Sequence, residues 1–164
     1  MEFKRFVAAL SVASALCAPV QAQELVFWGE GGGWDILVDP SLGNGCLIQA
    51  EFTNGVLVRI GFDRLEGMGY VTAFHENWGD IVEGEMYDIS FDLDGQSYDG
   101  VAKGMYLDGV PGADILFDNS DFLWDIAARQ TMTLYNDSGE VMAIDLTGTM
   151  VALEGAIDCQ NEQG

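Results

Sequence analysis

The clearest pattern in the chain is a two-residue alternation of apolar and polar side chains. From position 87 to 93 every second residue is large and apolar, and acids or serine occupy the positions between them. This period is typical of a β-strand with one buried face. Asp94 and Gly95 follow directly, and residues 98–107 are predicted to form the returning strand. The pattern therefore predicts a β-hairpin over residues 87–107.

The same alternation predicts further strands. Residues 46–52 and 56–62 alternate on either side of Asn54-Gly55, a dipeptide that favours a two-residue hairpin turn. Asp137-Ser138-Gly139 predicts a third turn near the C-terminus. The strands beside this turn and the remaining strand candidates are residues 131–136, 141–146, 26–28, 34–38, 69–74 and 114–117.

Two segments have a helical period instead. Apolar residues recur at helical spacing after Ser120 or Asp121, either of which can cap a helix that ends near Gln130. A second short helix is predicted over residues 149–157, and Cys159 follows it directly. Many strands and two short helices predict a mainly β, antiparallel fold with the second helix at the C-terminus. A Greek-key β-sandwich is favoured, and a flattened β-barrel is the alternative.

The first 22 residues have the organisation of a secretory signal peptide. Lys4 and Arg5 precede an apolar run over residues 6–18, and Ala22 ends a small-residue cleavage site. No later segment approaches the roughly 20 apolar residues that a transmembrane helix needs, so no membrane insertion is expected. We expect cleavage near Ala22, which leaves residues 23–164 as a single exported domain, periplasmic or extracellular.

Cleavage changes the cysteine count. Cys17 lies in the signal segment, so the mature chain keeps Cys46 and Cys159 as a pair. In an oxidising compartment such a pair favours a structural disulfide. The alternative is that Cys17 is the lipidated cysteine of a lipoprotein signal. Leu16 is bulky where that signal requires a small residue, which disfavours lipidation.

The chain is strongly acidic. Its formal net charge is −21, and removal of two cations and one acid with the signal changes it to −22. The cations that remain in the mature chain are Arg59, Arg64, Lys103 and Arg129. Such a surface repels nucleic acids and anionic lipids, whereas it attracts a basic protein, a cationic peptide or divalent metal ions. The alternative interpretation is that the acids simply keep the protein soluble in a saline exterior.

One acidic cluster suggests a calcium site, which is the only cofactor that we consider. Asp92 and Asp94 alternate before Gly95, and Asp99 follows closely, as oxygen ligands do at the start of a calcium loop. The third ligand before the glycine and the bidentate glutamate after it are missing. An Asp-Gly turn at the tip of a hairpin explains the same residues without a metal.

The tryptophans are the candidate binding residues. Trp28, Trp34 and Trp78 could form a stacking platform for a ligand, because aromatic rings often anchor interfaces. The alternative is that they fill the core and cap its ends. No catalytic residue is predicted, since His75 is the single histidine and no serine lies in a nucleophile-elbow pattern.

The C-terminal segment carries a family resemblance. Residues 143–148, with the sequence Ala-Ile-Asp-Leu-Thr-Gly, are followed by Ala152 and Leu153 on the predicted helix. This ending resembles that of small periplasmic proteins of the invasion-associated locus B type. The resemblance implies a β-sandwich in the bacterial envelope, with no catalytic residue to carry over.

Three functions follow as hypotheses. The first is an exported, non-catalytic protein whose acidic surface binds a basic protein or peptide. The second is a structural or stress-related component of the envelope. The third is a hydrolase that uses carboxylates alone, one of them in an apolar pocket. The sequence predicts no oligomeric state.

Overall fold

The structure is a computed structural model that describes residues 24–164. These residues form ten strands, two α-helices and one short 3-10 helix, η1 (Pro40–Leu42). The α-helices are α1 (Phe122–Ala127) and α2 (Thr149–Glu162). The strands are β1 (Val26–Gly31), β2 (Trp34–Asp39), β3 (Gly45–Glu51), β4 (Leu57–Asp63), β5 (Met68–Phe74), β6 (Met86–Leu93), β7 (Gln96–Leu107), β8 (Val110–Phe117), β9 (Thr131–Asn136) and β10 (Gly139–Asp145).

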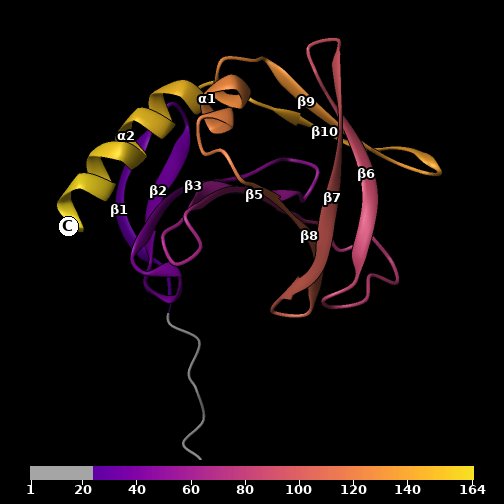
Figure 1. Cartoon of the computed structure of the whole chain (residues 1–164), viewed down its shortest axis with the longest axis horizontal. Coiled ribbons are helices and arrows are strands. Elements are labelled where there is room, and N and C mark those ends of the chain that lie inside the picture. Colours follow the sequence, from indigo (N-terminus) through magenta and orange to yellow (C-terminus); the bar gives the residue numbers. More distant parts are fainter. Residues whose placement is uncertain (1–23) are drawn as a thin grey trace, which may run out of the picture.

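All ten strands belong to one antiparallel sheet. Their order is β1-β2-β3-β4-β5-β8-β7-β6-β9-β10, so β8 returns to pair with β5. Within the described residues the edge strands β1 and β10 do not pair, and the sheet is therefore open. Figure 1 shows the sheet bent into an arch, with α2 lying over β1 and β2. The predicted mainly β, antiparallel fold is confirmed, and the bent sheet is consistent with a β-sandwich or a flattened barrel.

The two arms of the arch share one hydrophobic core. Ile48 of β3 and Ile60 of β4 are fully buried and belong to the same cluster as Leu93 of β6 and Met132 of β9. Strand alternation places these residues on the core face of the sheet. Complete burial of such a side chain stabilises the fold by about 1.5 to 3 kcal/mol.

Helix α2 closes one side of the core. Its buried side chains recur every three or four positions and face β1, β2 and β3. They are Thr149, Ala152, Leu153, Ala156 and Cys159. The helix extends past the predicted end at residue 157, so Cys159 lies within it. The apolar period did not reveal the last turn because Gln160, Asn161 and Glu162 are polar.

The predicted disulfide is present. Cys46 in β3 and Cys159 in α2 are bonded, with their Cα atoms 6.2 Å apart and a sequence separation of 113 residues. Gln160 accepts a hydrogen bond from the Cys46 amide at 2.9 Å and donates one to the Asn44 carbonyl at 3.3 Å. One covalent bond and two hydrogen bonds therefore fasten the C-terminal helix to β3.

Helix α1 is shorter than predicted. Asp121 is its N-cap residue, but the Asp121 side chain makes no capping hydrogen bond. The helix ends at Ala127, and just before and at the start of β9 the amides of Gln130 and Thr131 donate to the Asp94 carboxylate at 2.9 and 3.0 Å. These hydrogen bonds attach the segment between α1 and β9 to the β6–β7 turn.

The predicted hairpins are present. β6 and β7 pair across Asp94-Gly95, where both residues have positive φ, and β3 and β4 pair across the turn that contains Asn54-Gly55. The predicted signal peptide, with Cys17, lies outside the described residues. Among residues 24–164, no helix combines the length and the apolarity needed to cross a membrane.

Candidate functional site

A pocket of about 420 Å³ opens at the end of the core, between the β9–β10 hairpin and the sheet of β5, β8, β7 and β6. We call it the apolar pocket. Its floor is made by Ala73 of β5, Ala113 of β8 and Ala102 of β7, together with Val71 and Ile115. These residues lie on the core face of the sheet. Small side chains at three of the five floor positions leave the space that larger ones fill elsewhere in the core.

The walls of the apolar pocket are aromatic and held in place by hydrogen bonds. Trp78, Tyr87 and Tyr135 line it from the loop before β6, from β6 and from β9. The Val82 amide donates to the Tyr87 hydroxyl at 2.8 Å, and the Gly84 amide donates to the β7 carbonyl of residue 104 at 2.8 Å. The loop that carries Trp78 is therefore attached to two strands, which preorganises the pocket.

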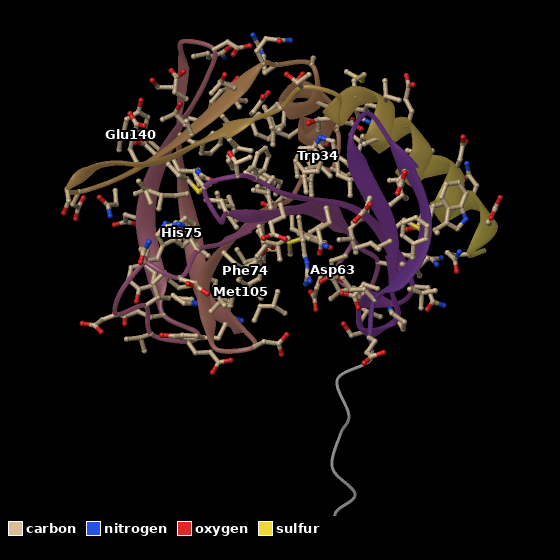
Figure 2. The ribbon with its side chains drawn as sticks, turned by 180° about the vertical axis from the view of Figure 1, so that it is seen from behind. Trp34, Asp63, Phe74, His75, Met105 and Glu140 are labelled. Atoms are coloured by element: carbon tan, nitrogen blue, oxygen red, sulfur yellow. A yellow bond between two sulfur atoms is a disulfide. The ribbon has the colours of Figure 1, made fainter. Side chains whose placement is uncertain are left out.

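The rim of the apolar pocket is acidic. Asp80 and Glu140 are exposed and line it, and no lysine or arginine does. Figure 2 shows Glu140 and His75 on the same side of the molecule. The His75 Nε2 atom lies 3.1 Å from the Asn54 carbonyl oxygen, so the imidazole ring connects the end of β5 to the β3–β4 turn. An apolar cavity with an acidic rim suits a ligand that is apolar at its tip and positively charged beside it.

The structure separates the three candidate tryptophans. Trp34 is buried, donates from Nε1 to the Thr147 carbonyl at 3.2 Å and packs edge-on against Phe52, so it is a core residue. Trp28 is half-buried and donates to Glu162 at the end of α2 at 2.8 Å. Trp78 alone among the three lines the apolar pocket.

The acidic cluster at the β6–β7 turn forms hydrogen bonds within the protein. Asp92 accepts from the Gly95 amide at 2.6 Å, and Asp94 accepts from the amides of Gln130 and Thr131. Asp99 is exposed on β7, opposite Ser90. Within residues 24–164, no three histidine, cysteine or acidic side chains form a group that could hold a metal ion. Asp92 thus stabilises the β6–β7 turn, and Asp94 attaches this turn to the start of β9.

The other face of the sheet, under the arch, carries a row of polar side chains. They occupy directly opposed positions on six consecutive strands, in the order Asp35, Gln49, Arg59, Thr72, Asp114 and Lys103. The buried Thr72 hydroxyl donates to the Asp114 carboxylate at 2.6 Å. Burial raises the pKa of Asp114 despite this bond, and burial lowers the pKa of Arg59.

The raised pKa of Asp114 predicts a stabilising substitution. The folded state holds the Asp114 proton more tightly than the unfolded state, so the ionised carboxylate costs stability above its folded pKa. We expect Asp114→Asn to raise the free energy of unfolding at pH 7 by about 0.5 to 1 kcal/mol, since the site is half-buried and the amide oxygen still accepts from Thr72. The gain should shrink as the pH falls through the folded pKa. Urea unfolding at several pH values measures it.

The control for this substitution is Asp99→Asn, which removes the same charge from an exposed position on β7. It should leave the stability within about 0.5 kcal/mol of the unsubstituted protein at every pH. Equal gains from both variants would show that general charge repulsion, and not burial at Asp114, is responsible.

Comparison with known proteins supports the fold. No family model matches the chain, and no curated protein matches it in sequence. The crystal structure of invasion associated protein B from Bartonella henselae resembles it with a TM-score of 0.60 and 14% sequence identity, over 80% of this chain and 96% of that one. The two proteins share a fold. The predicted resemblance to this kind of protein is thereby confirmed for the fold, without a shared sequence family, and the resemblance of the segment 143–148 itself stays a prediction.

Sequence reasoning missed most of the apolar pocket. Ala73, Ala102 and Ala113 carry no chemical signal, and they come together only because β5, β8 and β7 are neighbours in the sheet. Ala73 and Ala102 lie in the predicted strands 69–74 and 98–107, whereas Ala113 precedes the predicted strand 114–117 and lies in the longer observed β8. Trp78 was identified, but its partners were not.

Proposed function

We propose that this exported protein binds a basic peptide segment of another protein at the apolar pocket. A large apolar side chain of the segment enters the cavity, and adjacent lysine or arginine residues meet Asp80 and Glu140. The observation that carries the proposal is a 420 Å³ cavity with an apolar floor, aromatic walls and an acidic rim that no cation lines.

The two parts of the site contribute differently. Burial of one leucine-sized side chain contributes about 1.5 to 3 kcal/mol, independently of salt. The rim charges and the net charge of the chain accelerate encounter with a basic partner, and salt screens this effect. The predicted signal peptide and the disulfide support an envelope or extracellular setting, where the partner would also be found.

A set of three synthetic peptides tests the proposal. The first alternates leucine and lysine, the second replaces each lysine by glutamate, and the third replaces each leucine by serine. We expect only the first to bind in calorimetric titration, with an affinity that falls at least about fivefold between 50 and 500 mM salt. Binding of all three, or binding that ignores salt, would contradict the proposal.

Variants locate the binding site. Ala113→Leu fills the cavity and should weaken binding of the first peptide at least about tenfold, whereas Ala113→Ser is matched in size and should not. Asp80→Asn with Glu140→Gln should weaken binding at low salt about tenfold or less. The control pair Glu30→Gln with Glu154→Gln removes the same charge at the α2 end of the molecule.

The other two hypotheses stay predictions. A structural role in the envelope would show itself as co-purification with the cell wall or membrane and no soluble ligand. A carboxylate hydrolase would hydrolyse a substrate, and this hydrolysis would be lost when Asp114, whose pKa is raised, is replaced.

A further inference from the structure

A second pocket of about 220 Å³ lies under the arch, on the face of the sheet opposite the core. We call it the underside pocket. It contains the middle of the polar row, and apolar side chains from Phe74 of β5, Met105 of β7 and Leu116 of β8 border it. Figure 2 shows Asp63, Phe74 and Met105 close together beneath the arch. Its volume is below the roughly 300 Å³ at which pockets for drug-sized ligands begin, so it suits a small molecule.

Two glycines shape the underside pocket. A Cβ atom at Gly112 would come within 2.2 Å of the Phe74 ring, and one at Gly61 would come within 2.8 Å of the Tyr70 hydroxyl oxygen. The rings of Phe74 and Tyr70 therefore lie across the neighbouring strands. Both residues are almost fully buried, with 1% of Phe74 and 6% of Tyr70 exposed. This packing forms the apolar base of the underside pocket.

Arg59 supplies an unpaired cation to the underside pocket. Its Nε atom donates to Gln49 at 2.8 Å, and its guanidinium lies 5.7 Å from the centre of the Phe74 ring. Among the hydrogen bonds of residues 24–164, none uses its Nη1 or Nη2 atom. These terminal nitrogens match the geometry of a carboxylate, which accepts two parallel hydrogen bonds from a guanidinium.

Tyr70 supplies an unpartnered hydroxyl. The side chain is 94% buried and lines the underside pocket, yet its hydroxyl forms no hydrogen bond among the described residues. The hydroxyl oxygen is not among the fully buried side-chain polar atoms of residues 24–164, so a ligand with a donor or acceptor can reach it. Burial raises the pKa of the Tyr70 hydroxyl, and the negative charge of Asp39 raises it further.

The charges of the underside pocket are mixed. Asp39, Asp63 and Asp114 line it together with Arg59. A ligand with only a positive group would meet Arg59, and a ligand with only a negative group would meet three carboxylates. Along the polar row Arg59 and Asp114 flank the short side chain of Thr72, at a spacing of about 10 Å between their strands. A ligand that carries both charges a few bonds apart fits between them.

We propose that the underside pocket binds a free α-amino acid with an aliphatic side chain. The ligand carboxylate meets Arg59, its ammonium group meets the carboxylates, and its side chain packs on Phe74, Met105 and Leu116. A peptide terminus carries only one of the two charges, so it is a poorer match. This inference does not depend on the peptide site, because the two pockets lie on opposite faces of β5 and β8.

Three matched ligands test the inference on the unsubstituted protein. L-leucine has both charges, L-leucinamide lacks the carboxylate and N-acetyl-L-leucine lacks the ammonium group. Calorimetry or chemical-shift titration up to about 10 mM detects dissociation constants near 1 mM. We expect L-leucine to bind at least about tenfold more tightly than either analogue. No binding of L-leucine, or equal binding of one analogue, would overturn the proposal.

Two substitutions then assign the contacts. Arg59→Gln should reduce L-leucine affinity about tenfold and abolish its advantage over leucinamide, and Asp114→Asn should abolish its advantage over N-acetyl-leucine. Arg129→Gln is the control, because Arg129 contacts the Gln96 side chain at 3.4 Å and neither residue lines the underside pocket. Thermal melts confirm that each variant folds. Unchanged discrimination in both variants would overturn the assignment.

Discussion

Replacement of both Cys46 and Cys159 by alanine is expected to lower the free energy of unfolding by about 4 to 5 kcal/mol. The disulfide spans 113 residues, and on the chain-entropy model a loop of this length reduces the entropy of the unfolded ensemble and so raises its free energy by about that amount. Both cysteines are completely buried, so the double variant also loses some packing. Urea unfolding gives the difference directly, and the melting temperature should fall by about 10 to 20 °C.

Reduction of the unsubstituted protein is the matched control for this variant. It breaks the same covalent bond and keeps both sulfur atoms in the core, so it separates loop entropy from lost packing. The reduced protein should be less stable than the oxidised one and slightly more stable than the double alanine variant. A loss below about 1 kcal/mol in the double variant would show that Gln160 and the packing of α2 hold the helix on β3 without the covalent bond.

The substitution Gly148→Ala is expected to cost about 2 to 4 kcal/mol of stability. Gly148 precedes α2 with a φ of 81°, which an alanine adopts only under strain. A Cβ atom there would lie 1.8 Å from the Gly32 carbonyl oxygen in the β1–β2 turn. Because the obstacle is backbone, the start of α2 and the β1–β2 turn must separate. Differential scanning calorimetry or urea unfolding measures the loss.

Gly55→Ala controls for the strain of positive φ. Gly55 has a φ of 82° in the β3–β4 turn, and a Cβ atom added there would meet nothing within 4 Å. It should cost about 1 kcal/mol, which is the conformational part alone. Equal losses at both glycines would show that the backbone contact of Gly148 with Gly32 adds nothing to stability.

The two proposed binding sites provide controls for each other. β5 and β8 present Ala73 and Ala113 to the apolar pocket and Thr72 and Asp114 to the underside pocket. Successive residues of a strand face opposite sides, so a substitution at one site leaves the other facing the same way. Ala113→Leu should weaken peptide binding at least about tenfold and leave L-leucine binding unchanged, and Arg59→Gln should weaken L-leucine binding about tenfold and leave peptide binding unchanged. Loss of both activities in one variant would indicate a folding defect.

Much of the fold was predictable because its determinants are local. The alternation over residues 87–93 and the Asp94-Gly95 dipeptide are sufficient for the β6–β7 hairpin, since strand period and turn geometry depend on neighbouring residues. The pairing of Cys46 with Cys159 followed from counting, because only two cysteines lie beyond the predicted signal peptide. The contact of Asp94 with the segment between α1 and β9 was not predictable, because it joins residues that are far apart in the sequence.

The sequence by itself thus determined the strands, the main turns, the acidic charge and the disulfide, all of which depend on local pattern or on residue counts. Only the tertiary structure decided that β8 returns to pair with β5. That single non-local pairing aligns Arg59, Thr72 and Asp114 on one face and brings Ala73 and Ala113 together on the other. The energy of strand pairing is spread over whole strands, so no short sequence motif predicts which strands pair. Both candidate sites arise from the pairing of β5 with β8.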